Sequence, residues 1–218
     1  MSESPSLVTR PVSISWTVLL GLAIVAGLGF VWAFAVPYLR LDPTVLERFA
    51  GRTVWIYSHV ALGAVALFTG PPQLWMGEGR RRMPLHRKLG YVYVTVIALN
   101  VVIALYLAVT NEVSFVFGTG LGGLAIAWLL TTGMAMIAIR NGRLMAHREW
   151  MIRSYVTTMA FVFFRAFVGF TEALGLGSGV IERVGAASWF CWAVPLLLTE
   201  VVLQQKRVRQ SASRASAG

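Results

Sequence analysis

The stretch Leu89–Val109 reads LGYVYVTVIALNVVIALYLAV and contains no charged residue. A helix needs about 20 predominantly apolar residues to cross the hydrocarbon core of a bilayer. This stretch is long enough, and five other runs of the chain have a similar length and character: Ile14–Pro37, Val54–Leu74, Phe115–Ile139, Trp150–Leu174 and Ala186–Leu203. The sequence therefore predicts an all-α, polytopic membrane protein with six transmembrane helices in one bundle.

The composition supports a single embedded domain. Of the 218 residues, 57% are hydrophobic and only 13% are charged, and the mean hydropathy is +0.69. A soluble domain of this length is far more charged. We expect the bundle to span residues 14–204, between a disordered amino-terminal segment (1–13) and a basic, disordered tail (205–218). The second span is expected to end at Gly70-Pro71-Pro72, because proline removes helical hydrogen bonds.

The net charge of +10 is unevenly distributed along the chain. If the amino terminus is cytoplasmic, the inner segments hold fourteen basic residues: Arg10, Arg80, Arg81, Arg82, Arg87, Lys88, Arg140, Arg143, Arg148, Arg153, Lys206, Arg207, Arg209 and Arg214. The outer segments hold four, namely Arg40, Arg48, Arg52 and Arg183, and Arg165 lies within a span. The positive-inside rule then predicts that both termini are cytoplasmic. Basic charge of this kind indicates contact with anionic lipid rather than with nucleic acid.

Two of the three histidines have the same local setting. His86 and His147 each precede an arginine, and each opens a helix at the inner membrane face. Two neutral imidazoles from different helices could ligate one b-type haem. They could instead hold a divalent metal ion, if carboxylates or water fill the other positions. The alternative is that both are interfacial anchors beside lipid phosphates. Further polar or aromatic residues near this face could support the site: Arg87, Tyr93, Arg148, Arg153, Tyr155 and Glu200.

A second group of polar residues lies deeper in the spans. His59 and Arg165 both lie well below the outer surface, and a charged residue there normally faces the bundle interior with a partner. Glu172 follows Arg165 by seven residues, on the same helix face, and Asn100 lies near the middle of its span. We expect these residues to form an intramembrane cluster, either functional or a packing contact. Arg153 is predicted to pair with Glu149 or with Glu200 at the inner face.

Three stretches carry a resemblance: His59-Val60-Ala61-Leu62-Gly63 with Gly70-Pro71-Pro72-Gln73, Leu85-His86-Arg87-Lys88-Leu89-Gly90-Tyr91-Val92-Tyr93-Val94, and His147-Arg148-Glu149-Trp150-Met151-Ile152-Arg153-Ser154-Tyr155. Together they resemble a bacterial family of small predicted membrane proteins of unknown function. The resemblance covers the chain from about Val54 to Glu200, and it implies a multi-pass protein of the bacterial inner membrane without assigning an activity.

A more distant likeness is to b-type membrane cytochromes of the ascorbate-reducible, two-haem kind. Those proteins place pairs of histidines on helices at both membrane faces. This chain departs from the pattern, because three histidines can provide at most one bis-histidine site, at His86 and His147.

Three functions follow as hypotheses. The first is a membrane redox protein that holds one haem or metal through His86 and His147 and reacts with a quinone or another membrane redox partner. The second is a proton-linked transporter or channel that uses His59, Arg165 and Glu172. The third is a non-catalytic membrane protein that assembles with partners and whose polar residues are structural; an oligomer is possible. Whether the protein is an enzyme stays open.

Overall fold

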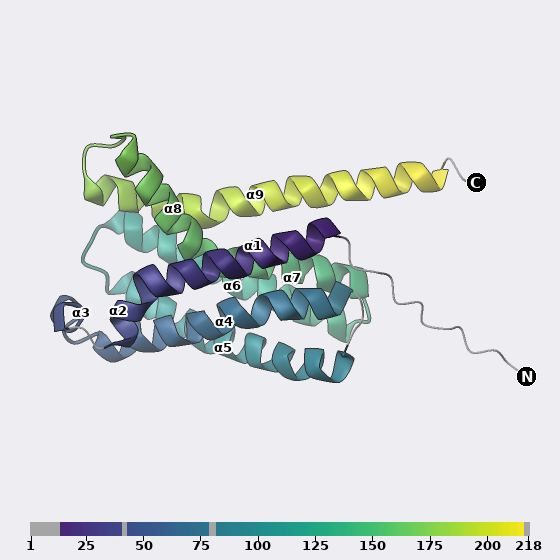
Figure 1. Cartoon of the computed structure of the whole chain (residues 1–218), viewed down its shortest axis with the longest axis horizontal. Coiled ribbons are helices and arrows are strands. Elements are labelled where there is room, and N and C mark those ends of the chain that lie inside the picture. Colours follow the sequence, from purple (N-terminus) through teal and green to yellow (C-terminus); the bar gives the residue numbers. More distant parts are fainter. Residues whose placement is uncertain (1–13, 41–42, 79–81, 216–218) are drawn as a thin grey trace, which may run out of the picture.

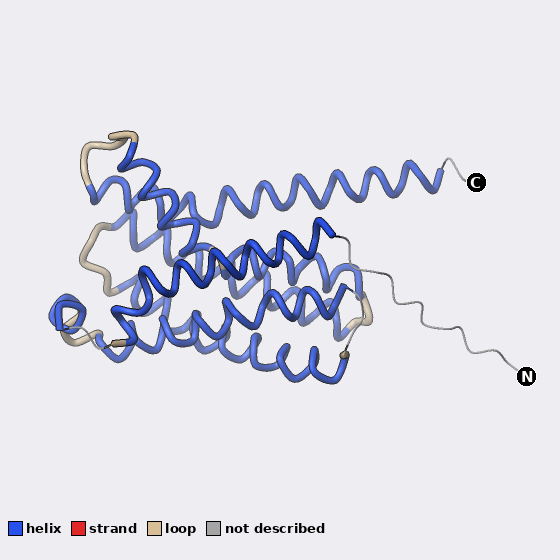
Figure 2. The backbone as a smooth tube through the Cα atoms, viewed as in Figure 1, coloured by secondary structure: helices blue, strands red, loops and turns tan. Residues whose placement is uncertain are grey.

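The fold is described from a computed structural model, which describes residues 14–40, 43–78 and 82–215. All of the regular elements within these ranges are helical (Figure 2). They are α1 (Ile14–Phe30), a π-helical segment η1 (Val31–Ala35), α2 (Val36–Leu39), α3 (Pro43–Arg48), α4 (Thr53–Glu78), α5 (Met83–Val109), α6 (Phe115–Arg140), α7 (Leu144–Thr158), α8 (Ala160–Ala173) and α9 (Val180–Ala215). The predicted disordered segment 1–13 lies outside the described residues.

Five segments are long and apolar enough to cross a membrane: Thr17–Ala35, Thr53–Glu78, Met83–Val109, Phe115–Arg140 and Val180–Arg209. The pair α7–α8 passes the same test together and is bent by 45° near Met159, so it provides a sixth span if it counts as one. The prediction of a polytopic, all-helical membrane protein is confirmed. The described start of α1 and the end of α9 lie at the same end of the bundle (Figure 1), as an even number of spans requires.

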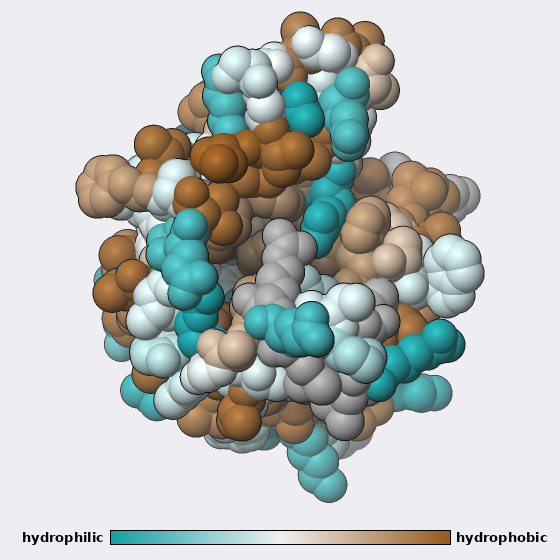
Figure 3. All heavy atoms as spheres, turned by 90° about the vertical axis from the view of Figure 1, so that its left-hand side faces the viewer, coloured by the Kyte–Doolittle hydropathy of each residue, from teal (hydrophilic) through white to brown (hydrophobic). Residues whose placement is uncertain are grey.

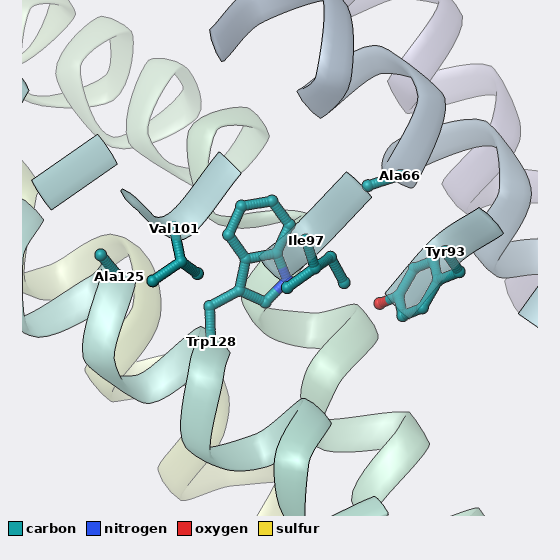
Figure 4. Packing of buried hydrophobic residues seen from close by; sticks show 6 residues of the cluster. All are labelled: Ala66, Tyr93, Ile97, Val101, Ala125 and Trp128. Carbon is teal, nitrogen blue, oxygen red and sulfur yellow. The ribbon is translucent and has the colours of Figure 1, made fainter. Parts of the chain in front are cut away.

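Four helices form a closed ring. α4 packs against α5, α5 against α6, α6 against α7, and α7 returns to α4, so that α5 and α7 stand opposite each other. α1 covers α4 on the outside of this ring, and α9 packs against α6, α7 and α8. Figure 4 shows part of the packed interior, where Tyr93 and Ile97 of α5 lie beside Trp128 of α6.

Small residues let α6 and α9 approach closely. A Cβ atom added to Gly120 would lie 2.1 Å from the Ser188 hydroxyl oxygen. The indole nitrogen of Trp192 donates to the carbonyl of Gly120 at 3.1 Å, across the same contact. Close backbone approach of this kind drives helix association where lipid removes the hydrophobic driving force.

The prediction that the second span ends at Gly70-Pro71-Pro72 is wrong, because α4 continues through both prolines to Glu78. Pro71 leaves the carbonyl of Leu67 without its usual amide donor four residues on. The Tyr155 hydroxyl of α7 donates to that carbonyl at 3.2 Å. A neighbouring helix thus replaces the missing hydrogen bond, which allows proline to remain inside a membrane helix.

The structure also differs from the sequence prediction at the carboxyl end. Instead of a disordered tail from residue 205, α9 stays helical to Ala215 and extends beyond the other helices (Figure 1). A helix already formed in the membrane needs only propagation, and the glutamine, lysine, arginine and alanine residues of this segment favour it. An ion pair between Arg207 and Glu149 of α7 also holds the extension.

Candidate functional site

Polar side chains recur at seven-residue intervals on the inward faces of α5 and α7. His86, Tyr93 and Asn100 follow one another on α5, and His147 and Ser154 do so on α7. The Tyr93 hydroxyl lies 3.0 Å from the Ser154 hydroxyl, so these two faces meet inside the ring. Seven residues are close to two helical turns, or about 10 Å along the axis. His86 and His147 therefore each lie about two helical turns before the point where these faces of α5 and α7 touch.

His147 is oriented by the backbone of α6. Its Nδ1 atom lies 2.9 Å from the carbonyl oxygen of Ala135. Because a carbonyl oxygen can only accept, Nδ1 carries the proton and the lone pair of Nε2 is left free. This pattern, an Nδ1–H held by a carbonyl, is common in histidines that bind a metal through the other nitrogen. It also satisfies a histidine that has only a structural role.

His86 packs against the inner half of α4. The Gln73 side-chain amide, itself buried, donates to the carbonyl of His86 at 2.8 Å. The imidazole lies beside Gly77, where an added Cβ would be 3.4 Å from the ring. Its Nδ1 atom is buried and has no hydrogen-bond partner. His86 and His147 are close enough for the charge on one to act on the other.

The donor set around these histidines is limited to two imidazoles. No group of three His, Cys, Asp or Glu side chains that could hold a metal occurs within residues 14–40, 43–78 and 82–215. The nearby Glu78 forms an ion pair with Arg148. The two imidazoles would be sufficient protein ligands for a bis-histidine haem, whereas structural zinc requires four ligands. Two surface hollows lie away from these residues, one along α9 and one between the outer halves of α4 and α5.

A network of buried hydroxyl groups occupies the next layer of the ring, and it joins Tyr93, Trp128, Thr132, Ser154 and Thr158. The Thr158 hydroxyl donates to the backbone carbonyl of Ser154 at 2.9 Å and accepts from the Trp128 indole at 3.0 Å. Tyr93 then donates to Thr158 at 2.9 Å and accepts from Ser154, which accepts from Thr132 at 2.7 Å. Each of the five donor groups therefore has an acceptor, and only one direction of donation fits the whole network. Figure 4 shows the Tyr93 hydroxyl on the side of the ring that faces Ile97 and Trp128.

The inner ends of α7 and α9 are joined by charged residues. Arg153 donates from Nε to Glu200 at 3.0 Å and lies 4.0 Å from Glu149, so both expected partners are found. Arg207 also pairs with Glu149, and the Arg153 guanidinium lies 4.7 Å from the centre of the Trp150 ring. Arg87, in contrast, is exposed.

The expected outer cluster forms only in part. His59 Nδ1 lies 2.8 Å from the Asn100 side-chain oxygen, and the Asn100 amide donates to the His59 carbonyl at 3.2 Å. Arg165 and Glu172 do not join them, and both side chains are exposed. The prediction that Arg165 points into the bundle is wrong. α8 buries its other face, which carries Ala160, Phe164 and Thr171, and the guanidinium instead lies 4.8 Å from the Phe34 ring centre.

Sequence reasoning missed several residues of the interior, namely Gln73, Trp128, Thr132, Ser154 and Thr158. Their signal in the sequence is weak, because isolated hydroxyl residues are common in membrane helices and usually bond to their own backbone. The spacing of Ser154 from His147, which matches that of Tyr93 from His86, was the available clue.

A scan against models of protein families matches residues 56–203 to a family described as "Predicted membrane protein (DUF2306)". The chain belongs to the DUF2306 family of predicted membrane proteins. The matched region begins in α4 and ends in α9, so it contains the closed ring and both inner histidines. The family has no known function. Searches of curated proteins and of solved structures found no match.

Proposed function

We propose that this DUF2306 protein is a membrane redox protein of the bacterial inner membrane that holds one b-type haem between His86 and His147. Its electron partner would be a quinone or another redox protein in the bilayer, and its basic inner surface would contact anionic lipid. The observation that carries the proposal is the contact between Tyr93 and Ser154.

This contact supports a common direction for the helix faces that carry the two histidines. α5 and α7 stand opposite each other in the ring, and their hydroxyl groups bridge its interior at 3.0 Å. A straight helix drifts by only about 20° over seven residues. His86 and His147 therefore project from the same two faces toward the same axis, nearer the inner membrane surface. Two lipid-facing anchors would not require this register.

The state of each imidazole supports ligation. The Ala135 carbonyl holds His147 with its Nε2 lone pair free, and His86 has a buried nitrogen with no partner. A buried polar atom without a hydrogen bond is costly, and such an atom needs an explanation. Gly77 lies against the His86 ring and leaves room that a larger side chain would fill. When bound, a haem supplies one-electron chemistry, while the protein supplies ligation and orientation.

The other hypotheses have less support. A divalent metal would have only the two imidazoles and water, since the described residues offer no third ligand nearby. A transporter based on His59, Arg165 and Glu172 would retain only His59, because the other two side chains face outward. The haem proposal keeps both of its residues, one on the inward face of α5 and one on the inward face of α7.

The test is a reduced-minus-oxidised absorbance spectrum of the purified protein, expressed with a haem precursor. We expect a b-type α-band with one haem per chain. His86→Leu and His147→Leu should each remove it, whereas His59→Gln, the matched control at the other end of the bundle, should retain it. A folded wild-type protein without the band, or a band that survives replacement of both inner histidines, would contradict the proposal.

A further inference from the structure

The outward face of α8 carries an unusual combination of residues. Arg165, Ala166, Gly169, Phe170, Glu172 and Ala173 are all exposed. At 100° per residue, Arg165, Gly169 and Glu172 fall on one narrow strip of the helix. Figure 3, which views the molecule end-on from the side opposite to the described end of α9, shows the α8–α9 end protruding at the top.

Neither charge on this strip has a counter-charge among the residues that the structure describes. The ion pairs formed by the residues in 14–40, 43–78 and 82–215 involve neither Arg165 nor Glu172. Along α8 they are about 10 Å apart, which is too far for a direct pair. The Phe34 ring attracts the Arg165 guanidinium at 4.8 Å but supplies no negative charge. A charge exposed on a membrane helix normally faces a partner rather than lipid.

The strip is complementary to itself. Gly169 lies midway between Arg165 and Glu172, and a Cβ added there would meet nothing within 4 Å. Gly169 and Ala173 form a small-xxx-small pair, which allows two helices to approach closely. In a two-fold contact centred on Gly169, each Arg165 faces the Glu172 of the other copy, because an isologous contact pairs residue i with j and j with i.

The bend of α8 makes this pairing geometrically possible. If α7 lies along the membrane normal, α8 is tilted from the normal by 45°. Arg165 and Glu172 then differ by only about 7 Å in their depth along the normal. Two extended side chains can cover that difference. In a straight span, the same residues would lie at depths about 10 Å apart, and a two-fold axis along the normal would keep them apart.

We propose that a second copy of this chain docks on the outward face of α8, with reciprocal Arg165–Glu172 ion pairs around a Gly169 contact. The occupant is a second copy because the face carries both charges of the pair at matching distances from its centre. The dimer does not depend on haem binding, so it can be tested in the protein with or without that cofactor.

The first test is a charge exchange, measured by energy transfer between donor- and acceptor-labelled chains in lipid vesicles. Arg165→Glu and Glu172→Arg alone each place like charges together and should weaken association by roughly tenfold or more. The double exchange Arg165→Glu with Glu172→Arg should restore most of it. Arg183→Glu, a charge change on a half-buried residue of α9 outside this strip, is the control and should leave association unchanged.

The second test is disulfide cross-linking in a Cys191→Ala background, which removes the one native cysteine. Gly169→Cys should cross-link two chains efficiently, whereas Val102→Cys, at a residue of α5 that is 66% exposed, should not. A monomeric wild-type protein in vesicles, failure of the double exchange to restore association, or equal cross-linking at both positions would overturn the proposal.

Discussion

At the scale of single residues, Tyr93 shows how one hydroxyl group connects three helices. It is fully buried, and it contacts Ser154 and Thr158 of α7, while Trp128 of α6 donates to the same Thr158. In lipid the helices gain little from hydrophobic burial against one another, so hydrogen bonds and close packing determine their arrangement. Tyr93 therefore holds α5 in one register against α7.

Tyr93→Phe keeps the ring and removes only this hydroxyl group. We expect the midpoint of thermal unfolding in detergent to fall, by a loss of about 0.6–2 kcal/mol of stability, because Ser154 and Thr158 lose a partner. Tyr91→Phe is the matched control, since Tyr91 is 70% exposed. Equal effects of the two substitutions would show that the buried network does not stabilise the fold.

At the scale of one helix, α4 depends on α7 to pass through two prolines. Pro71 frees the Leu67 carbonyl, and the Tyr155 hydroxyl occupies it. The Tyr155 ring also fills the space beside Gly70, where an added Cβ would lie 2.1 Å from a ring carbon. The Gly-Pro-Pro segment of α4 and the tyrosine of α7 thus form one structural unit, although 84 residues separate Pro71 from Tyr155.

A double-mutant cycle tests this unit. Tyr155→Phe should destabilise the wild-type protein by about 1 kcal/mol, because it leaves the Leu67 carbonyl unsatisfied. In a Pro71→Ala background the restored backbone amide can bond to that carbonyl, so the same substitution should cost clearly less. The measurement is the thermal unfolding of all four proteins, and strictly additive effects would contradict the interpretation.

The pairing of α7 with α9 can be tested through its charges. Arg153 is buried and bonds to Glu200, whereas the Arg207 side chain is 50% exposed. Arg207→Ala should therefore cost about 0–1 kcal/mol, as exposed ion pairs do. Arg153→Met should cost more, because it removes a buried cation and leaves Glu149 and Glu200 near each other without it. Chemical denaturation would show which substitution lowers the free energy of unfolding more. A larger decrease for Arg207→Ala than for Arg153→Met would contradict the prediction.

At the scale of the whole molecule, the charge distribution predicts the orientation in the membrane. Fourteen basic residues fall on the predicted inner side and four on the outer side. A reporter fused after Gly218 should therefore be active only in the cytoplasm. The described ends of α1 and α9 lie at the same end of the bundle, so an amino-terminal reporter should give the same result (Figure 1). Periplasmic activity of the carboxyl-terminal fusion would reverse the assignment.

The length and polarity of each apolar run determined the fold class, because crossing a bilayer requires a local property of about 20 residues. The same reasoning identified Arg153 with Glu149 and Glu200, and His59 with Asn100, since a polar group in a span must find a partner. The contacts of Arg153 with Glu200 and of His59 with Asn100 required knowledge of depth alone, whereas Glu149 lies one helical turn before Arg153. Depth follows directly from position in the sequence.

Only the tertiary structure decided which helix face looks inward. The sequence placed Arg165 in the interior and ended the second span at Pro71, and both predictions were wrong. In the structure Arg165 lies on the exposed face of α8, and a hydroxyl group from α7 bonds to the carbonyl that Pro71 leaves free in α4. In a membrane both faces of a helix are apolar, so periodicity does not mark the buried face as it does in water. The rotation of each helix is set by its neighbours through small residues and hydrogen bonds, which become visible only when the helices are packed.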